Sequence, residues 1–520
     1  MIRYKRSFFL CLIILSTFQS KAQGYADKLR QLLQMQQPDN FGLQYFKEVK
    51  AFYTANSYRF SWLINQRNDL ATLTGYILQA TEQGLNKEDY QPSLFWSRDN
   101  ENYIPGNEKD SLLAEIKYTD AAIHFFHDVL MGNRADQLSY NGVNYIPECY
   151  DLPALLNDHL DKGRFTGLLG ETGVSEPGYL AIKKMLNLFQ QKSAALHFQD
   201  ATVTSLIAYN KNKPLLKRLF QLGLLASDTG YIGDAVVVAA VKEAQKLFDL
   251  LNDGKLRSTN LKALNVPLAI RIVELKNTLN SLRWLSCLKA TGHVIIVNIP
   301  SATLTLYEHG NAVLNSRVIV GKKSTATPTL SAIVTEVILY PYWNVPYKIA
   351  TQEILPRIRR NPAYLETNAY QVLNRNGKLM DPTSINWHLL SARNFPYAIR
   401  QSTGCDNALG LIKLNFYNPF SVYLHDTPGK SLFALNKRYF SHGCMRVEEA
   451  MELGHYILKD NAIAIDTLTV KGCLKSQSPV IVPATEKIPV FVIYHTAWPD
   501  PGSGMKFYED VYVQVPRPTK

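Results

Sequence analysis

The run that decides the fold of this chain is His293-Val294-Ile295-Ile296-Val297-Asn298, where a helical pattern gives way to strands. It is short and β-branched, and Thr303-Leu304-Thr305-Leu306-Tyr307 repeats the same character shortly afterwards. A turn signal at His309-Gly310-Asn311 separates these runs from the next one, over residues 316–321. Short β-rich runs divided by turn residues predict consecutive strands. From residue 291 to residue 516 the sequence therefore predicts a mostly antiparallel β domain.

Upstream of that run the chain reads as helical. It lacks strict alternation and contains amphipathic stretches of helix length. Helices are predicted over 69–83, 115–131, 215–225, 236–251 and 269–285. The total length of 520 residues suits two to four domains. We expect a multidomain α+β protein, with helical domains over 23–174 and 175–290 ahead of the β domain.

The β domain is interrupted once, by residues 346–400. This insertion replaces the strand rhythm with helical and loop segments, the clearest of which are 354–360, 363–372 and 385–392. Strands are predicted to resume over 411–416, 421–425 and 488–498.

The chemistry is concentrated in Ser441-His442-Gly443-Cys444-Met445-Arg446-Val447, where Ser441 follows His425 by 16 residues. A thiolate is the nucleophile in thiol acyl transfer, and a nearby histidine can generate it near neutral pH. Gly443 lacks a Cβ, so the backbone can turn sharply and aim the N–H groups of Gly443 and Cys444 at one oxyanion. Residues 447–458 have apolar residues at helical spacing. This predicts that Cys444 lies just before a helix N-terminus, whose dipole favours the thiolate.

These residues resemble the signature of the L,D-transpeptidases, which are cysteine enzymes that cross-link bacterial peptidoglycan. In that family a histidine is followed, after a gap, by Ser/Thr-x-Gly-Cys-x-Arg/Asn, and Arg446 fills the last position here. Pro341-Tyr342-Trp343-Asn344-Val345-Pro346 and Asn407-Ala408-Leu409-Gly410 resemble the large, multidomain branch of the family. The resemblance covers residues 292–515 and is weaker upstream.

The resemblance implies a division of the chain into functional domains. It implies a helical scaffold domain over 23–174 and a peptidoglycan-binding-like module with a connecting helix over 175–290. The catalytic domain would span 291–516, with the insertion at 346–400 capping the substrate. Ala244-Gln245 stand where the module's second long helix usually has Phe-Gln. A simple helical spacer therefore remains an equal alternative to a glycan-binding module.

The resemblance also implies roles for individual residues. Cys444 is the nucleophile, and His425 is the base that deprotonates it and later protonates the leaving amine. The other ring nitrogen of His425 needs an acceptor, which in the family is a backbone carbonyl, here that of Asp426. A triad through the Asp426 carboxylate is less favoured, because adjacent side chains on a strand point to opposite faces. Gly443 and His442 complete the catalytic set, with His442 as a second base, a substrate contact or a shaping residue. Substrate binding is implied for Tyr423, Ser441, Arg446, Trp343 and Asn407, with Ser441 and Arg446 holding the turn or binding a carboxylate.

The implied reaction joins two peptidoglycan tetrapeptide stems through a 3→3 link, with an acyl-thioester on Cys444. It needs no metal or cofactor, and carbapenems are the expected inhibitors. Two alternatives stay open: an L,D-carboxypeptidase, and an inactive peptidoglycan-binding scaffold. A zinc site is disfavoured because the chain has no CxxC or HExxH pattern. A sortase-like enzyme is disfavoured because its arginine lies on a different strand from its cysteine.

Residues 1–22 read as a cleaved secretory signal rather than a membrane anchor. Arg3, Lys5 and Arg6 precede an apolar stretch at 8–18, which is short for a membrane span of roughly 20 residues. We expect export to the cell envelope, and to the periplasm where the host has an outer membrane. Loss of residues 1–22 lowers the formal charge from +12 to +8. That balance suits an acidic polymer or a membrane surface and is too diffuse to indicate nucleic acid.

The cysteines beyond residue 22 are odd in number, so at least one thiol is free or intermolecular. The resemblance makes Cys444 the free one. The pairing of Cys149, Cys287, Cys405 and Cys473 cannot be read from spacing, and buried free thiols are expected for most of them.

His124 and His127 lie three residues apart on a predicted helix and could share a metal ion. Ordinary packing beside two phenylalanines is favoured, because no further ligands of matching spacing follow.

Overall fold

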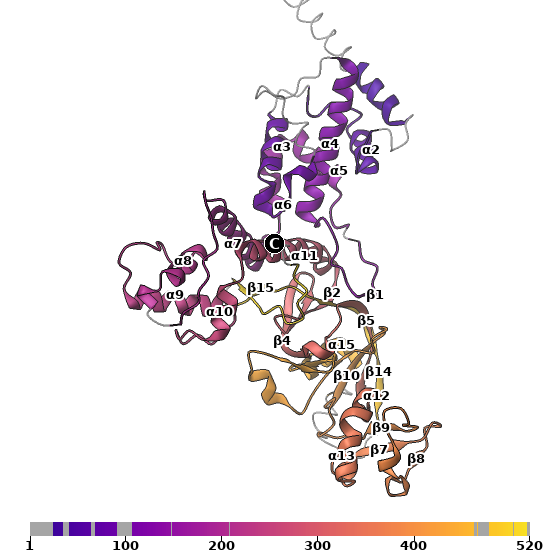
Figure 1. The fold of residues 1–520 in the computed structure, drawn as a ribbon. Coiled ribbons are helices and arrows are strands. Elements are labelled where there is room, and N and C mark those ends of the chain that lie inside the picture. The colour runs from indigo at the N-terminus through magenta and orange to yellow at the C-terminus, as the bar shows by residue number, and fades with distance from the viewer. Residues whose placement is uncertain are drawn as a thin grey trace, which may run out of the picture.

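The computed structural model describes residues 24–34, 41–63, 68–90, 107–146, 148–206, 209–461, 465, 478–502 and 504–516. Residues 1–22, which carry the predicted export signal, and Cys473 lie outside these ranges. Figure 1 shows an elongated molecule, with helices at one end, a β-sheet in the middle and a small lobe at the other end. Within the described ranges, no helix combines the length and the apolar character that a membrane span requires.

The N-terminal domain is a group of helices around one hydrophobic core. Its longest helix, α4 (Glu108–Leu130), begins after Asn107, whose side chain accepts a hydrogen bond from the Asp110 N–H. Such a cap satisfies one of the N–H groups that the first helical turn leaves unpaired. Most residues of α4 are buried, so this helix forms the centre of the domain. Around it lie a helix over 24–34, α2 (Phe46–Ala55), α3 (Asp69–Leu78), α5 (Leu152–Asp161) and α6 (Leu168–Thr172).

His124 and His127 are occupied by packing and ion pairing on α4. Their ring nitrogens lie 3.3 Å and 3.0 Å from the two carboxylate oxygens of Asp128. The Tyr45 ring packs against both imidazoles, at centroid distances of 5.4 Å and 5.1 Å. Among the described residues, no three His, Cys, Asp or Glu side chains gather as a metal site. The packing interpretation therefore agrees with the structure.

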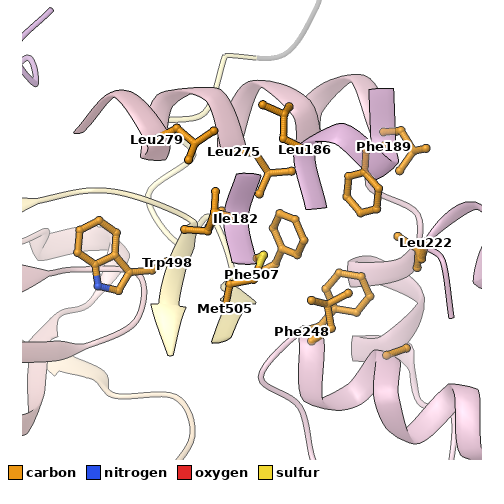
Figure 2. Packing of buried hydrophobic residues seen from close by; sticks show 14 of the residues in the cluster. Ile182, Leu186, Phe189, Leu222, Phe248, Leu275, Leu279, Trp498, Met505 and Phe507 are labelled. Carbon is orange, nitrogen blue, oxygen red and sulfur yellow. The ribbon is translucent and has the colours of Figure 1, made fainter. Parts of the chain in front are cut away.

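The second helical unit shares its core with the end of the chain. It consists of α7 (Pro177–Ser193), α8 (Lys213–Gln221), α9 (Asp234–Leu247), α10 (Ser258–Leu264) and α11 (Leu268–Thr291). A hairpin of β15 (Ala497–Asp500) and β16 (Gly504–Phe507) inserts beside α7 and α11. Figure 2 shows Met505 and Phe507 of this hairpin among Ile182, Leu186 and Leu275. The last segment of the β domain is thus packed into the helical unit.

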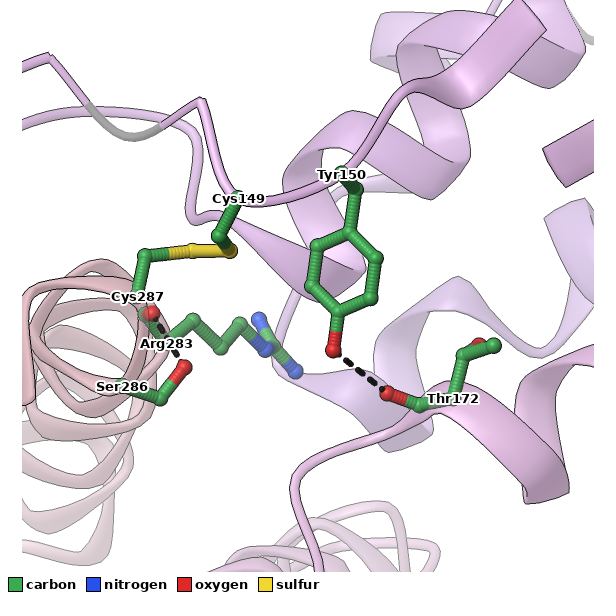
Figure 3. Close-up of a disulfide and its surroundings, with 6 residues drawn as sticks. All are labelled: Cys149, Tyr150, Thr172, Arg283, Ser286 and Cys287. Carbon is green, nitrogen blue, oxygen red and sulfur yellow. Dashed lines mark hydrogen bonds between the residues drawn. A yellow bond between two sulfur atoms is a disulfide. The ribbon is translucent and has the colours of Figure 1, made fainter. Parts of the chain in front are cut away.

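A disulfide fastens the N-terminal domain to α11. It joins Cys149 to Cys287, with 5.4 Å between the Cα atoms (Figure 3). Cys405 is also disulfide-bonded. The expectation of buried free thiols is therefore wrong for these three cysteines. Cys149 and Cys287 are 138 residues apart, so only the tertiary contact between a loop and a distant helix reveals the pair.

The C-terminal half contains a β-sheet that closes on itself. Its strands are β1 (Tyr140–Asn141), β2 (His293–Asn298), β3 (Thr303–Glu308), β4 (Asn311–Gly321), β5 (Leu330–Leu339), β10 (Ile412–Phe416), β11 (Leu424–His425), β12 (Tyr439–Ser441), β13 (Met445–Val447) and β14 (Val480–Ile493). The order is β1-β5-β10-β11-β13-β4-β3-β2-β14, and a further β5–β14 pairing closes the path into a ring. Most neighbours are antiparallel, as predicted, whereas β1–β5, β11–β13, β12–β4 and β14–β2 are parallel. The prediction of a multidomain α+β protein is confirmed.

The two faces of this sheet have different tasks. Leu414 of β10, Leu424 of β11 and Met445 of β13 are completely buried in one core, which α15 (Ala450–Leu458) also covers. Side chains alternate between the two faces along a strand. The residues between these apolar positions therefore lie on the opposite face, and that face carries the candidate site.

The insertion forms a lobe with its own sheet and core. Its sheet has the order β6-β9-β7-β8, formed by β6 (Trp343–Asn344), β7 (Tyr370–Leu373), β8 (Leu379–Met380) and β9 (Ala398–Gln401). Its helices are α12 (Tyr347–Ile349), a π-helical turn over Ala350–Ile354, α13 (Leu355–Arg360) and α14 (Tyr364–Thr367). Ile354, Ile358, Val372 and Ile399 belong to its separate core.

Two of the helical and loop segments singled out in the insertion are helical only in part. The one predicted over 363–372 ends at Thr367, and Ala369 then adopts a φ of 53°. A left-handed residue breaks the helix, and Tyr370–Leu373 pairs with β9 instead. In the segment 385–392 the helical part is a 3₁₀ turn, Trp387–Leu389, capped by the Asn386 side chain.

Candidate active site

Three adjacent strands place a row of ionisable side chains on the outer face of the sheet. Lys413 of β10 is paired with His425 of β11, and His425 is paired with Arg446 of β13. Residues paired across neighbouring strands share one face of the sheet. The imidazole of His425 therefore has one cation on each side.

Cys444 immediately precedes β13, next to Tyr423 of β11. The parallel register pairs Leu424 with Met445, and the Met445 N–H donates to the Tyr423 carbonyl at 3.0 Å. Cys444 is a free, partly exposed cysteine. Its sulfur lies two residues along the strand from Arg446, hence on the same face as that side chain.

The helix predicted from the spacing over 447–458 is present as α15 (Ala450–Leu458), but the prediction that Cys444 lies just before its N-terminus is wrong. Met445–Val447 is the strand β13, and α15 begins only at Ala450. The helix dipole acts within about one turn of the terminus. It therefore gives no account of a thiolate at Cys444.

Ser441 holds the turn that presents Cys444. Its hydroxyl oxygen accepts a hydrogen bond from the Gly443 N–H at 3.1 Å and donates one to the Cys444 carbonyl at 2.6 Å. Gly443 has a φ of 119°, a conformation that side-chain-bearing residues rarely adopt. The expected oxyanion role of the Gly443 N–H is not supported, because Ser441 already occupies that donor. Ser441 is 3% exposed, so it shapes the turn rather than facing a substrate.

A second clamp comes from the loop after β4. The Thr327 hydroxyl donates to the Gly443 carbonyl at 2.8 Å and accepts from the Gly321 N–H at 2.9 Å. A Cβ on Gly321 would lie 2.2 Å from the Thr325 carbonyl oxygen, so only glycine fits there. The Tyr512 hydroxyl closes the arrangement by donating to the Gly321 carbonyl at 2.6 Å.

His425 is fixed by the backbone of its neighbour. Its Nδ1 lies 2.5 Å from the Asp426 carbonyl oxygen, and that contact requires Nδ1 to carry the proton. Nε2 is then left as a proton acceptor. The Asp426 carboxylate points elsewhere, accepting from the Leu411 N–H at 3.0 Å and pairing with Lys430 at 2.8 Å. The carbonyl alternative predicted from sequence is therefore the one the structure contains.

Burial controls the protonation of both central groups. It raises the pKa of the Cys444 thiol above its usual range, against the opposing effects of hydrogen bonds from Tyr423 and the nearby cations. Burial lowers the pKa of His425 to about 3, and the charges of Arg446 and Lys413 act in the same direction. Near neutral pH the pair is therefore a thiol beside a neutral imidazole.

His442 connects the catalytic turn to the insertion. Its Nε2 lies 2.7 Å from a carboxylate oxygen of Glu353, in the π-helical turn of the insertion. Lys322 approaches the same nitrogen at 3.5 Å. The His442 ring is thus turned toward the insertion, and of the roles expected from sequence this contact supports the shaping one.

The remaining predicted substrate residues separate into two groups. Tyr423 and Arg446 lie on the site face, and the Tyr423 ring meets the His425 ring edge-on at 5.6 Å. Asn407 does not face a substrate: it is 2% exposed, and its amide bonds the Pro341, Ser402 and Leu409 backbone. Trp343 belongs to the sheet of the insertion and packs near Tyr370 at 6.3 Å.

Two family models match the chain. One describes an L,D-transpeptidase catalytic domain and matches residues 292–482, and the other describes a scaffold domain and matches residues 47–186. The first range contains His425, Cys444 and the whole insertion. The chain carries an L,D-transpeptidase catalytic domain behind a scaffold domain.

Known proteins are similar over part of the chain. A Haemophilus influenzae protein named "Putative L,D-transpeptidase" is 39% identical over 210 residues, which are 40% of this chain and 42% of the relative's length. A solved L,D-transpeptidase from Stackebrandtia nassauensis is 14% identical with a TM-score of 0.19, covering 57% of this chain and 97% of that one. One from Mycobacterium smegmatis is 13% identical with a TM-score of 0.18, covering 39% and 58%. With TM-scores this low, the family assignment rests on the sequence matches.

Sequence reasoning missed four residues of the candidate site. Lys413 lies between the buried residues Ile412 and Leu414. The alternation of apolar and polar residues along this strand already indicated that the Lys413 side chain lies on the outer face of the sheet. No comparable signal exists for the other three, Thr327, Glu353 and Tyr512, because each meets the catalytic turn from a distant segment.

A cavity of about 750 Å³ lies elsewhere in the molecule, between the second helical unit and the C-terminal hairpin. Its walls include Phe248, Ile270, Phe507 and Tyr508. None of its lining residues belongs to the Cys444 face, so this cavity is separate from the candidate site.

Proposed function

We propose that this protein is a cysteine L,D-transpeptidase that cross-links peptidoglycan stem peptides through an acyl-thioester on Cys444. The observation that carries the proposal is the placement of a free thiol on the same sheet face as a histidine whose Nδ1 is fixed by a carbonyl. That histidine offers Nε2 as a base, as a thiol acyltransferase requires.

In the first half-reaction the Cys444 sulfur attacks the carbonyl of the third stem residue, and the thiol proton passes to His425 Nε2. The tetrahedral intermediate collapses, the bond to the terminal D-alanine breaks, and the leaving amine takes the proton from His425. An acyl-thioester remains. Because the resting pair is uncharged, the thiolate forms during the attack rather than before it.

In the second half-reaction the side-chain amine of another stem attacks the thioester carbonyl. His425 accepts the amine proton, and the sulfur leaves and is protonated again. A 3→3 amide link results, with Cys444 restored. No group outside the chain and its two substrates is required for either half-reaction.

The oxyanion of both tetrahedral intermediates is assigned to the Cys444 N–H. Within the described residues this N–H donates no hydrogen bond, whereas the Gly443 N–H is bonded to Ser441. A backbone donor fixed beside the nucleophile is worth roughly 3 kcal/mol in the transition state. The clamps at Ser441 and Thr327 keep this donor in place.

The insertion is proposed to cover the bound stem. Its contact with the catalytic turn through Glu353 and His442 places it next to the site. Exclusion of water would direct the thioester to the amine rather than to hydrolysis. We propose that the enzyme acts in the cell envelope after export, where peptidoglycan stems are found.

The test is the intact mass of the protein after incubation with a purified disaccharide-tetrapeptide, alongside Cys444→Ala. The expected result is an acyl adduct on the wild type alone, with release of D-alanine and appearance of a cross-linked dimer. Equal melting temperatures of the two proteins would show that the variant is folded.

Other outcomes would replace the proposal. An adduct that yields only tripeptide would indicate an L,D-carboxypeptidase. Absence of any adduct, with peptidoglycan still bound, would indicate the inactive scaffold.

A further inference from the structure

Two cations lie on the site face without an acidic partner. Within the described residues, the Lys413 ammonium forms no ion pair, and it lies over the Tyr423 ring, 4.2 Å from the centroid. Arg446 likewise has no ion pair there, and its Nε is buried without a hydrogen-bond partner. Both side chains are only half exposed. Half-buried cations normally have an acidic partner, so two such cations without one indicate a missing anion.

Among the described residues, one carboxylate acts on the charge of Lys413, and it is already engaged. It belongs to Glu336, which accepts a hydrogen bond from Asn415 at 2.7 Å and makes no ion pair with the lysine. The Asp426 carboxylate is bound to Lys430 and Leu411. The Cys444 sulfur can offset the charges of Lys413 and Arg446 only as a thiolate, and burial keeps the resting group a neutral thiol. In the resting site the anion therefore comes from outside the described residues.

The position of the two cations relative to the Cys444 thiol indicates which group of a bound peptide the anion is. Lys413 reaches over Tyr423, which lies beside Cys444, and Arg446 is two residues beyond Cys444 on the same face. Strands in a sheet are about 4.8 Å apart, so the two cations flank the space directly above the sulfur and the His425 ring. An anion held there lies one residue from the carbonyl under attack. A peptide that ends one residue past that carbonyl has its terminal carboxylate at this distance.

We propose that Lys413 and Arg446 form a carboxylate-binding site that holds the free C-terminal carboxylate of the acyl donor, one residue beyond the carbonyl that Cys444 attacks. Arg446 supplies a planar, two-pronged donor, and Lys413 supplies a point charge. The bound carboxylate also offsets the two positive charges beside His425, so proton transfer to the imidazole becomes easier when the donor is in place. The identity of this carboxylate as the donor terminus rests on the proposed function, whereas the anion site does not.

The site can be tested without peptidoglycan by comparing two alkylating reagents of nearly equal size. Iodoacetate carries a carboxylate next to its reactive carbon, and iodoacetamide carries a neutral amide. Each forms a bond from Cys444 Sγ to its CH₂ group and releases iodide, and peptide mapping restricts the measurement to Cys444. The quantity of interest is the ratio of the iodoacetate rate to the iodoacetamide rate.

Lys413→Met keeps the length and the apolar stem of the side chain and removes the charge. We expect the rate ratio to fall by roughly tenfold, the size of a charge contact at a half-buried site. Lys413→Arg should retain the ratio. Lys47→Met, an exposed lysine on α2 in the N-terminal domain, removes the same charge from a distant surface and should change nothing.

An unchanged ratio in Lys413→Met would overturn the proposal, and so would an equal fall in Lys47→Met. A variant whose site is merely distorted would react more slowly with both reagents and leave the rate ratio unchanged. That outcome also counts against the proposal.

The donor assay then separates this inference from the proposed function. With a tetrapeptide donor, Lys413→Met should raise KM far more than it lowers kcat, and a C-terminal amide donor should show no such difference between the two proteins. If the alkylation ratio responds to Lys413 but no tetrapeptide is processed, the carboxylate site stands and the proposed function fails. If tetrapeptide turnover is normal and the alkylation ratio does not respond to Lys413, the proposed function stands and the carboxylate site fails.

Discussion

Thr327 provides the sharpest test of how the fold positions the nucleophile. Its side chain is 1% exposed, and its hydroxyl joins the Gly321 N–H to the Gly443 carbonyl at 2.9 Å and 2.8 Å. Thr327→Val keeps the shape and removes the hydroxyl, which leaves a buried donor and a buried acceptor unpaired. Each unpaired group costs about 1–3 kcal/mol, so for the two groups together we expect a loss of roughly 2–6 kcal/mol in the stability of the β domain.

The functional effect should exceed what stability alone would cause. Gly443 precedes Cys444, so loss of the clamp should loosen the turn and slow acylation of Cys444 even where the protein is fully folded. Urea unfolding measures the change in stability, and the rate of Cys444 acylation at 25 °C measures the functional effect. Thr327→Ser keeps the hydroxyl and serves as the matched control. A valine variant with wild-type stability and wild-type acylation would refute the view that this side chain positions the turn.

Three further predictions follow from the protonation states and the cross-link. Because burial raises the pKa of Cys444, the rate of its alkylation by iodoacetamide should still be climbing above pH 9; a plateau near pH 7 would instead indicate a thiolate–imidazolium pair. Burial, and then the charges of Arg446 and Lys413, lower the pKa of His425 to about 3. Between pH 6.5 and 3 the unfolded chain therefore binds a proton at this residue that the folded protein does not bind. The free energy of unfolding should fall by about 1.4 kcal/mol for each pH unit below 6.5, and His425→Gln should flatten that part of the stability profile. Replacing Cys149 and Cys287 by serine opens a link across 138 residues, which the chain-entropy model values at about 5 kcal/mol. The melting temperature should drop, and reductant should lower that of the wild type at least as far, because it also opens the disulfide of Cys405. An unchanged melt of the double variant would contradict the estimate.

The sequence predicted two strands of the sheet closely, because burial and alternation coincide in them. The strand predicted over 421–425 shortens to Leu424–His425, and the one predicted over 488–498 is divided between β14 and β15. The run His293–Asn298 is a strand with the predicted limits, and 411–416 differs from β10 by one residue. The family resemblance identified His425 and Cys444, and the Asp426 carbonyl contact followed from it. All of these features depend on short stretches of sequence whose residue pattern can be recognised without knowledge of the tertiary structure.

The errors have a common physical origin in long-range contacts. Residues 447–458 have helical periodicity, but Met445–Val447 pairs with β4 and β11 before α15 can start. The family resemblance implied substrate binding for Asn407, yet its amide is hydrogen-bonded to the backbone of Pro341 and Leu409. A cysteine pair 138 residues apart has no local signal at all. Tertiary pairing overrides local preference in each case.

The register of three strands links these observations to the proposed chemistry. If β10 or β13 slipped by one residue against β11, Lys413 or Arg446 would turn into the apolar core, and the His425 ring would lose a flanking cation. The hydrophobic residues at 412, 414, 424, 445 and 447 exclude that slip, because they would have to leave the core. The same packing that stabilises the domain therefore holds two positive charges beside a buried neutral imidazole. A base in that setting accepts a proton poorly until an anion enters the site. The donor's own carboxylate is the anion that arrives with the reaction, so substrate recognition and activation of the thiol are carried by one contact.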